Sequence, residues 1–316
     1  MTCEKSFDLA IAGELNLDLI LYGLPLEMET ERDLLATGFV CTLGSSSAIV
    51  AHNAAMLGLR VRFATLVGDD DFGRVALDRL RRAGVELSGV VVDAGVATGV
   101  TVLLPHGSVR HNLTYTGAIS MLSCAHLNVE ALQQARHVHL CSLYLQTSLQ
   151  AGLPELVRSL KQSGTTISLD TNDDPANTWG APLEQLLPLV DILMPSVGEL
   201  CRMAGTADSA QAIASFAPEV PLLVVKQGRH GCSVRVDGRV HRVPGLNVEP
   251  VDTIGAGDSF DAGFLAATLL GLDPLEAARA GNITGALSTQ AAGGTEAFRD
   301  ANAVRLFLQK HGYPSA

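Results

Sequence analysis

The chain has 316 residues, of which 47% are hydrophobic, so it is long enough to bury one large core together with a small accessory domain. Its 22 Lys and Arg against 33 Asp and Glu give a formal net charge of −11, and no basic cluster runs along the sequence. This balance argues against a nucleic-acid partner, and an anionic substrate would need local positive charge.

Three further features bear on the location of the protein. No apolar stretch nears the length of a membrane span, so no membrane partner is expected. The first residues lack the basic start and cleavage site of a signal peptide. The six cysteines form no Cys-x-x-Cys pair and are typical of core residues in a reducing compartment, so we expect a cytoplasmic protein.

Short apolar runs alternate with segments of helical periodicity through most of the chain. The runs are residues 61–67, 137–143, 166–169, 191–194 and 222–225, and the helical segments are 72–83, 149–162 and 197–204. This alternation is typical of βαβ units. It predicts an α/β fold, doubly wound, with a mostly parallel sheet flanked by helices.

Two regions, 21–41 and 97–116, interrupt this pattern and resemble antiparallel strands inserted between α/β elements. We expect them to form a small β-sheet lid, which leaves residues 1–20, 42–96 and 117–316 for the large domain. A separate hairpin is predicted for 232–236 and 239–243, because Asp237-Gly238 suits a tight type I′ turn.

The segment that points to chemistry is Gly255-Ala256-Gly257-Asp258, which begins as a loop and continues into a helical pattern. Small residues let backbone N–H groups converge beside a helix N-terminus, where the helix dipole also favours negative charge. A phosphoryl group in transfer needs such donors, because positioning and electrostatics do most of the catalytic work. We predict that the three small residues form an anion site and that Asp258 takes the proton from an attacking hydroxyl.

The same segment also allows a helix cap, a P-loop or a dinucleotide-binding motif. An isolated Asp that opens a helix is more often an N-cap, but a cap does not require Gly-x-Gly before it. The sequence contains no Gly-x₄-Gly-Lys-Ser/Thr, and the Gly-x-Gly here lacks the third glycine of a dinucleotide-binding motif. The sequence therefore supports neither a P-loop nor a typical dinucleotide fold.

Residues 252–260, Asp-Thr-Ile-Gly-Ala-Gly-Asp-Ser-Phe, resemble the C-terminal signature Asp-Thr-x-Gly-Ala-Gly-Asp-x-Phe of the ribokinase-like (PfkB) carbohydrate kinases. The resemblance extends over nearly the whole chain. It implies the same doubly wound domain with a β lid closing over a sugar, ATP as phosphoryl donor, Asp258 as base and Thr253 at the cofactor.

The resemblance also implies an acceptor site near the N-terminus. Asn16 and Asp18, two residues apart on one strand face at the end of the first strand, correspond to residues that face sugar hydroxyls in the family, although an exposed strand end is the commoner explanation for such a pair. The family's first signature is matched in part at Gly44-Ser45, where Ser45 replaces a second glycine.

Two more acceptor candidates follow. Ile49 stands where the family's first signature has Asn, and Asn53 lies one helical turn later on the same face. Arg110, which leaves the lid, could reach a substrate group or remain a solvated surface charge.

The cofactor end of the site is implied by several shorter matches. Candidates beside ATP are Asp170, Asn172, Ser196, Lys226, Gly228, Gly231 and Asn282, the last of these near the adenine. Glu199 is retained from the family's Pro-Asn-x-x-Glu and is expected to bind Mg²⁺, through water or directly, although Ser196 replaces its Asn. Asp252 and Gly293 are candidates for a monovalent cation such as K⁺.

These patterns predict an ATP-dependent sugar kinase of ribokinase or fructokinase type that phosphorylates a primary hydroxyl of a small sugar or sugar derivative. A nucleoside kinase of the same family is one alternative. A noncatalytic sugar or nucleotide sensor on this fold is the other, motivated by Ser45, Ile49 and Ser196. The apolar lid run 100–104 is compatible with a homodimer through the lid.

Overall fold

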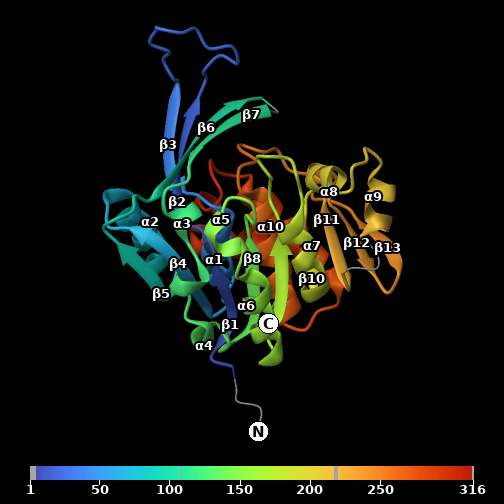
Figure 1. Cartoon of the computed structure of the whole chain (residues 1–316). Coiled ribbons are helices and arrows are strands. Elements are labelled where there is room, and N and C mark those ends of the chain that lie inside the picture. Colours follow the sequence, from blue (N-terminus) through green and yellow to red (C-terminus); the bar gives the residue numbers. More distant parts are fainter. Residues whose placement is uncertain (1–4, 108, 217–219, 315–316) are drawn as a thin grey trace.

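The computed structural model describes residues 5–107, 109–216 and 220–314. Residues 1–4 of the predicted large domain, with Cys3, and Ser108 of the predicted lid lie outside the described residues. Two sheets are present: a nine-stranded sheet in the order β13-β12-β11-β10-β9-β8-β1-β4-β5 and a four-stranded sheet in the order β3-β2-β6-β7. In Figure 1 the smaller sheet stands above the larger one as a separate layer. The predicted α/β class with a small β lid is confirmed.

The large sheet consists of β1 (Phe7–Ala12), β4 (Val61–Gly68), β5 (Glu86–Asp93), β8 (Ala135–Cys141), β9 (Thr166–Asp170), β10 (Ile192–Leu193), β11 (Leu222–Lys226), β12 (Cys232–Val236) and β13 (Arg239–Val243). The lid strands are β2 (Asn16–Tyr22), β3 (Gly38–Leu43), β6 (Gly99–His106) and β7 (Val109–Tyr115).

The α-helices are α1 (Ser46–Met56), α2 (Asp71–Arg82), α3 (Ala118–Met121), α4 (Val129–Leu132), α5 (Thr147–Gln150), α6 (Leu153–Gln162), α7 (Ala181–Leu186), α8 (Val197–Met203), α9 (Ser209–Ser215), α10 (Ala256–Leu269), α11 (Pro274–Ser288) and α12 (Ala301–Lys310). Short 3₁₀ turns are η1 (Cys124–His126), η2 (Leu187–Leu189), η3 (Gly228–His230) and η4 (Glu296–Phe298). The helix predicted over 149–162 is two helices, because Pro154 near the start of α6 cannot supply the N–H that a continuous helix needs.

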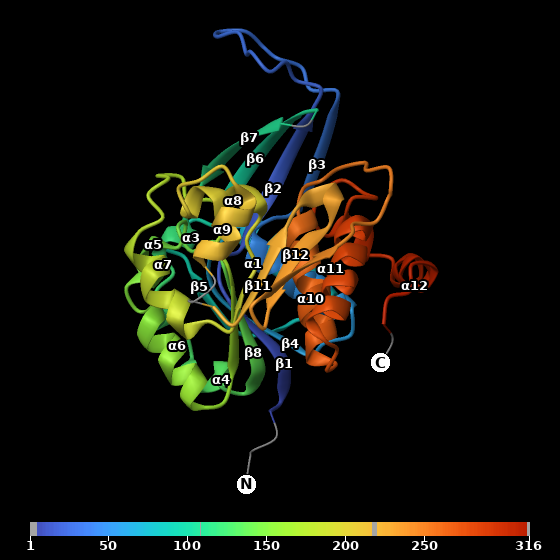
Figure 2. The ribbon, with the colours of Figure 1, turned by 90° about the vertical axis from the view of Figure 1, so that its right-hand side faces the viewer.

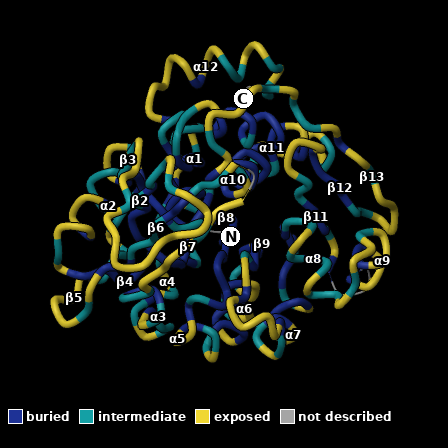
Figure 3. The backbone as a smooth tube through the Cα atoms, turned by 90° about the horizontal axis from the view of Figure 1, so that it is seen from above, coloured by how far each residue is buried: buried dark blue, intermediate teal, exposed yellow. Residues whose placement is uncertain are grey.

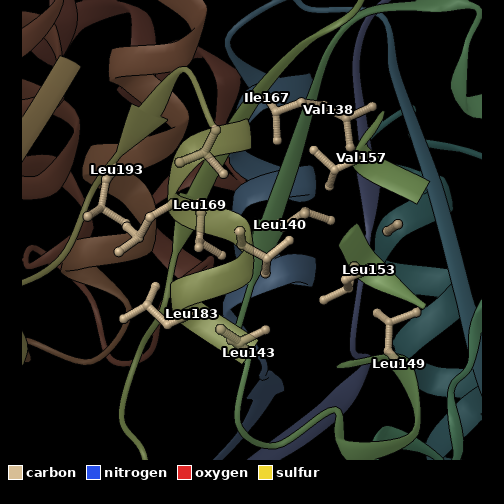
Figure 4. Packing of buried hydrophobic residues seen from close by; sticks show 14 of the residues in the cluster. Val138, Leu140, Leu143, Leu149, Leu153, Val157, Ile167, Leu169, Leu183 and Leu193 are labelled. Atoms are coloured by element: carbon tan, nitrogen blue, oxygen red, sulfur yellow. The ribbon is translucent and has the colours of Figure 1, made fainter. Parts of the chain in front are cut away.

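Helices cover both faces of the large sheet, as the alternation of side chains along β1 shows. Ala10 and Ala12 join the core cluster under α3 to α9, whereas Leu9 and Ile11 join the cluster under α1, α2, α10 and α11. Figure 2 shows these two helical layers on opposite sides of the strands, and Figure 4 shows the packing of β8 and β9 against α6 and α7. Viewed from above, burial is greatest in the centre and in α10, while α12 and the outer edges are exposed (Figure 3).

The strands β1, β4, β5 and β8 to β11 pair in parallel, and the last hairpin pairs antiparallel with them at one edge. That hairpin, β12–β13, turns at Asp237 (φ 49°) and Gly238 (φ 72°), both left-handed as a type I′ turn requires. The predicted hairpin is confirmed in its residues and its turn.

The lid differs in detail from the predicted segments. Its strands begin at Asn16 and extend to Leu43, so the small sheet takes in residues on both sides of 21–41. The two hairpin pairs are antiparallel as expected, but β2 and β6 pair in parallel, because the chain passes through α1, β4, α2 and β5 between them. Phe39, Leu113 and Tyr115 are exposed there, and the predicted homodimer would bury this surface.

The fold brings the functional segments to one edge. The neighbours of β1 are β4 on one side and β8 on the other, so the strand order reverses there. Ligands of doubly wound sheets bind outside the carboxyl ends of the strands at such a switch point. None of the helices in the described part of the chain combines the length and apolar composition needed to cross a bilayer.

Candidate active site

The site centres on the start of α10. Gly255 is the N-cap of this helix, with φ 71°, so Asp258 is its third residue and not its cap. A Cβ at position 255 would lie 2.4 Å from the Cα of Gly294, so a side chain there is excluded by space as well as by backbone conformation. The capping interpretation of Asp258 therefore falls, because glycine already occupies the capping position and no side chain caps the helix.

The backbone around Gly255 offers free donors. In the described part of the chain the N–H groups of Gly255, Gly257 and Asp258 donate no hydrogen bond to the protein, whereas the N–H of Ala256 points to the carbonyl of Thr253 at 3.3 Å. Free N–H groups at the N-terminus of a 14-residue helix are suited to binding an anion. Of the three residues predicted to line such a site, Gly255 and Gly257 have a free N–H group, as Asp258 also does, whereas Ala256 does not.

Asp258 is 9% exposed. Burial raises its pKa to about 6; Lys226 opposes this rise, while Asp170 and Glu14 add to it. A carboxyl group with a pKa near 6 is ionised at neutral pH and still basic enough to take a proton.

Beneath the anion site lies a buried group of charges. Lys226 Nζ donates to Asp170 Oδ2 at 2.6 Å and to Asp261 Oδ2 at 2.9 Å. A Cβ on Gly257 would lie 3.6 Å from this Nζ, so the ammonium group lies close to Gly257. Carboxylate oxygens of Asp170, Asp258 and Asp261 all lie within 4.8 Å of one another, so Lys226 balances three acids.

A second buried carboxylate faces Asp258 from the lid. Asp18 is 6% exposed, and its pKa is raised to about 7 by burial and by the negative charge of Asp258, while Arg110 opposes this rise. Asn16, on the same face of β2, donates from Nδ2 to Thr101 Oγ1 at 2.9 Å, but its buried Oδ1 has no partner. An unpaired buried acceptor beside a carboxylate is a place for ligand hydroxyl groups.

Gly44 packs closely against both of these side chains. A Cβ at Gly44 would lie 2.2 Å from Asp18 Oδ1 and 2.4 Å from Asn16 Oδ1. The expected location of Asn16 and Asp18 at the end of the first strand is wrong, because β1 ends at Ala12 and both residues lie on lid strand β2. The lid itself therefore carries the predicted acceptor contacts.

Of the other residues predicted to bind the acceptor, Ser45 and Asn53 are used in hydrogen bonds within the protein, whereas the side chain of Arg110 donates none to the described residues. Ser45 caps α1 and donates from Oγ to the carbonyl of Glu14 at 2.8 Å, so its hydroxyl is used locally. Asn53 is fully buried, with Nδ2 donating to Ser259 Oγ at 2.9 Å and to the Gly294 carbonyl at 3.0 Å. The structure thus places Asn53 between α1 and α10 rather than against a substrate, because its amide is fully used there. Arg110 lies on β7, and its positive charge opposes the rise in the pKa of Asp18.

The residues predicted beside the phosphates lie at the ends of β9 and β10. Asn172, with φ 52°, accepts at Oδ1 from Ser142 N at 2.8 Å and donates from Nδ2 to Asp170 at 3.4 Å. Ser196 caps α8, and Glu199 Oε2 accepts from Ser196 N at 2.8 Å in a capping box.

The carboxyl group of Glu199, the predicted magnesium ligand, is only partly used by these contacts. Glu199 Oε1 accepts no hydrogen bond from the described residues, and burial and Asp170 raise the pKa of this carboxyl group. One oxygen thus remains free in a cluster of acids, and carboxylate oxygen is the ligand that Mg²⁺ prefers. Glu199 therefore fits a magnesium-binding role.

The nucleotide-side candidates form a separate group around the turn between β11 and β12. Gly228 begins η3, and Gly231 follows it. Asn282 on α11 donates from Nδ2 to the carbonyls of Val243 and Pro244 at 3.3 and 3.1 Å, so it holds the chain that leaves β13. Thr253, two residues before Gly255, is exposed.

The candidates for a monovalent cation do meet, but their contacts are already made. Asp252 accepts from Tyr22 Oη at 2.7 Å, from Gly293 N at 3.2 Å and from Ile254 N at 3.0 Å. A carboxylate that accepts three hydrogen bonds ties the lid and the Gly293 turn to the glycine loop. These contacts do not favour a cation at the Asp252 side chain.

Sequence reasoning missed two residues. Asp261 completes the Lys226 cluster, and its spacing of three residues from Asp258 places both on one face of α10, a signal that could have found it. Glu14 is 2% exposed and accepts from Ser47 Oγ at 2.6 Å, which fixes the start of α1.

Comparisons with known proteins agree with this geometry. Residues 6–301 match the family described as pfkB family carbohydrate kinase. An ATP-dependent ribose-1-phosphate kinase of Halopiger xanaduensis is 31% identical over 271 residues, which cover 84% of this chain and 86% of that protein. A probable fructokinase-2 of Arabidopsis thaliana is 31% identical over 238 residues, 71% of this chain and 72% of that protein.

A solved structure extends the comparison to three dimensions. An E. coli protein assigned as ribokinase II, in complex with ATP and Mg²⁺, superposes with a TM-score of 0.83 at 26% identity, covering 96% of this chain and 100% of that one. The family match spans nearly all of the chain, and the fold and the glycine-loop signature agree with it. The chain therefore belongs to the PfkB family of carbohydrate kinases.

Proposed function

We propose that this kinase transfers the γ-phosphoryl group of ATP to a primary hydroxyl of a small sugar or sugar derivative held between Asp18 and Asp258. The observation that carries the proposal is the position of Asp258, which is buried, not used as a cap, and adjacent to free amides at the start of α10. A binding module would need the anion site but not a second buried carboxylate opposite it.

The acceptor would be held from the lid. Asp18 and the unpaired Oδ1 of Asn16 would accept hydrogen bonds from sugar hydroxyl groups, and the absence of a side chain at Gly44 lets these two oxygens pack against it. Arg110 faces the same site and suits an acceptor that carries a negative group. Closure of the lid would exclude water, which would otherwise accept the phosphoryl group.

The chemical step then follows from the positions of the groups. The carboxylate of Asp258 takes the hydroxyl proton while the acceptor oxygen forms a bond to the γ-phosphorus and the bond from that phosphorus to the bridging oxygen of ADP breaks. The N–H groups of Gly255, Gly257 and Asp258 donate to the equatorial oxygens of the moving phosphoryl group. Asp258 afterwards releases its proton to solvent.

The remaining candidates would serve the donor. Glu199 would hold magnesium, which when bound neutralises phosphate charge, whereas Oδ2 of Asp170 is held by Lys226. Gly228, Gly231 and Asn282 lie on the side where the nucleoside of ATP would bind. Two relatives are named for ribose-1-phosphate and fructose, and these names support a sugar or sugar phosphate as acceptor in this chain as well.

An ATP-consumption screen tests the proposal. Purified protein is offered sugars, sugar phosphates, sugar acids and nucleosides, and Asp258→Asn is assayed in parallel with Asp33→Asn, an exposed loop carboxylate. We expect turnover with a sugar-type acceptor and a fall in kcat of roughly 10²–10⁴-fold in Asp258→Asn with ATP binding retained. Turnover only with nucleosides selects the nucleoside kinase, and ATP binding without turnover on any acceptor selects the sensor.

A further inference from the structure

The environment of Lys226 bears on the proton-accepting role proposed for Asp258. The carboxylates of Asp170, Asp258 and Asp261 lie within 4.8 Å of one another, and the three residues are 1%, 9% and 0% exposed. Three carboxylates at such distances cannot all stay ionised in a low-dielectric site without a cation, because like charges favour proton uptake.

Lys226 is held in place as that cation. Its side chain is 10% exposed, and its two partners are 2% and 0% exposed, so neither ion pair is screened by solvent. Two of its three N–H donors are taken by Asp170 and Asp261. At most one N–H donor is left for a phosphate. The contacts of Lys226 therefore do not favour a role in nucleotide binding alone.

Other charged groups also face Asp258. Glu14 faces it from the segment between β1 and β2, Asp18 from β2, Asp170 from β9 and Asp261 from its own helix, and all four are acids. The Ser46 side chain from α1 lowers the pKa of Asp258. Among the charged groups of the described residues named here, Lys226 on β11 is the only cation that faces Asp258.

We infer that Lys226, clamped by Asp170 and Asp261, is the counter-charge that keeps Asp258 ionised and thereby fixes the lowest pH at which the enzyme can work. Lys226 is in this sense a positioning residue, since it acts through Asp258. The inference rests on the proposed function only for its consequence in catalysis; the effect on Asp258 is a property of the folded protein without substrate.

The test follows the titration of Asp258 directly. Protein carrying ¹³C-labelled Asp carboxyl groups is titrated by NMR without ligands, and the Asp258 signal is identified by its absence in Asp258→Asn. In Lys226→Met we expect the midpoint of this signal to rise by about one pH unit or more, a tenfold change in proton affinity. Asp170→Asn removes a negative neighbour and should lower the midpoint, and the double variant should return it toward that of the wild type.

The control is Lys161→Met, because Lys161 also pairs with a carboxylate, Asp191 at 2.6 Å, but does not face Asp258. It should leave the Asp258 midpoint unchanged. Opposite shifts in Lys226→Met and Asp170→Asn cannot both come from general structural damage. If Lys226→Met does not fold, Lys226→Gln, which also removes the positive charge, replaces it, and the same rise of the Asp258 midpoint is expected.

Two results would overturn the inference: an unchanged Asp258 midpoint in folded Lys226→Met, with the proton taken up by Asp170 or Asp261 instead, or a rise in the KM for ATP without any movement of that midpoint. The acid limb of kcat/KM should move with the NMR midpoint. If no acceptor is turned over by the wild type, the proposed function fails, while the titration still decides the role of Lys226.

Discussion

Tyr22 donates a 2.7 Å hydrogen bond from its phenol to Oδ2 of Asp252. A side chain of lid strand β2 is thus tied to the first residue of the signature segment, residues 252–260. The contact is reinforced by a small apolar cluster in which Ile20 and Leu103 of the lid pack against Ile254 of that segment. The acceptor-binding sheet and the phosphoryl-binding loop are therefore joined directly. The lid orientation and the loop geometry are expected to change together.

Removal of this link should weaken acceptor binding more than chemistry. In Tyr22→Phe we expect the KM for the acceptor to rise several-fold with a smaller change in kcat, and the free energy of unfolding to fall by about 1 kcal/mol. Steady-state kinetics and urea denaturation measure the two effects. Tyr115→Phe, in the same sheet but 58% exposed, is the matched control. Equal kinetics in both variants would show that the bond does not couple the lid to the loop.

Gly44 should be intolerant of even one methyl group. A Cβ there would lie 2.2 Å from Asp18 Oδ1, so Gly44→Ala must displace the carboxylate proposed to hold the acceptor. We expect the KM for the acceptor to rise by about tenfold or more, since small misplacements of binding groups are costly. In Gly180→Ala the nearest heavy atom is 3.9 Å away, and its kinetics should match those of the wild type. Wild-type KM in Gly44→Ala would remove Asp18 from the acceptor site.

Asn53 should prove structural. Its amide donates to Ser259 and to the Gly294 carbonyl, so Asn53→Ala leaves buried groups without partners and should lower the free energy of unfolding by about 2 kcal/mol. Denaturant unfolding measures this, with exposed Asn302→Ala on α12 as control. The KM for the acceptor should stay within about twofold of wild type. A large rise in KM with unchanged stability would return Asn53 to the substrate site.

Asp258 should cost the protein stability above neutral pH. Its folded-state pKa of about 6 lies above the ordinary value of 3.8, because burial disfavours the charged form. The folded state therefore holds its proton more tightly than the unfolded chain; the stabilisation is complete below pH 3.8 and is lost as pH rises through about 6.

The neutral variant reveals this cost. Asp258→Asn should be more stable than wild type at pH 8, by on the order of 1–3 kcal/mol, and the difference should shrink toward zero near pH 4. Urea denaturation at several pH values measures it, and exposed Asp33→Asn should show no such trend. A variant that is less stable than wild type at pH 8 would contradict the desolvation of Asp258.

Local patterns were sufficient for much of the fold. The alternation of apolar runs and helical periodicity predicted the doubly wound sheet, and Asp237-Gly238 predicted the last hairpin, since both depend on neighbours in the sequence. The edge strand β5 was not predicted, although it contains the apolar run Val90–Val92; its residues are half-buried or exposed, because it lies at the edge of the sheet. The parallel pairing of β2 with β6 depends on residues about 80 positions apart.

The candidate site, like the fold, was predictable from the sequence only where it depends on neighbouring residues. The sequence by itself determined that a glycine loop opens a helix at Asp258, because small residues and a helix start are local properties. Only the tertiary structure decided what Asp258 is near. In the folded protein Lys226 pairs with Asp170 and Asp261, which are 56 and 35 residues away in the chain. The amide of Asn53 on α1 likewise donates a hydrogen bond to Ser259 on α10. Partners so distant in sequence are chosen by the packing of the whole sheet, and burial then decides which of the charges must be balanced.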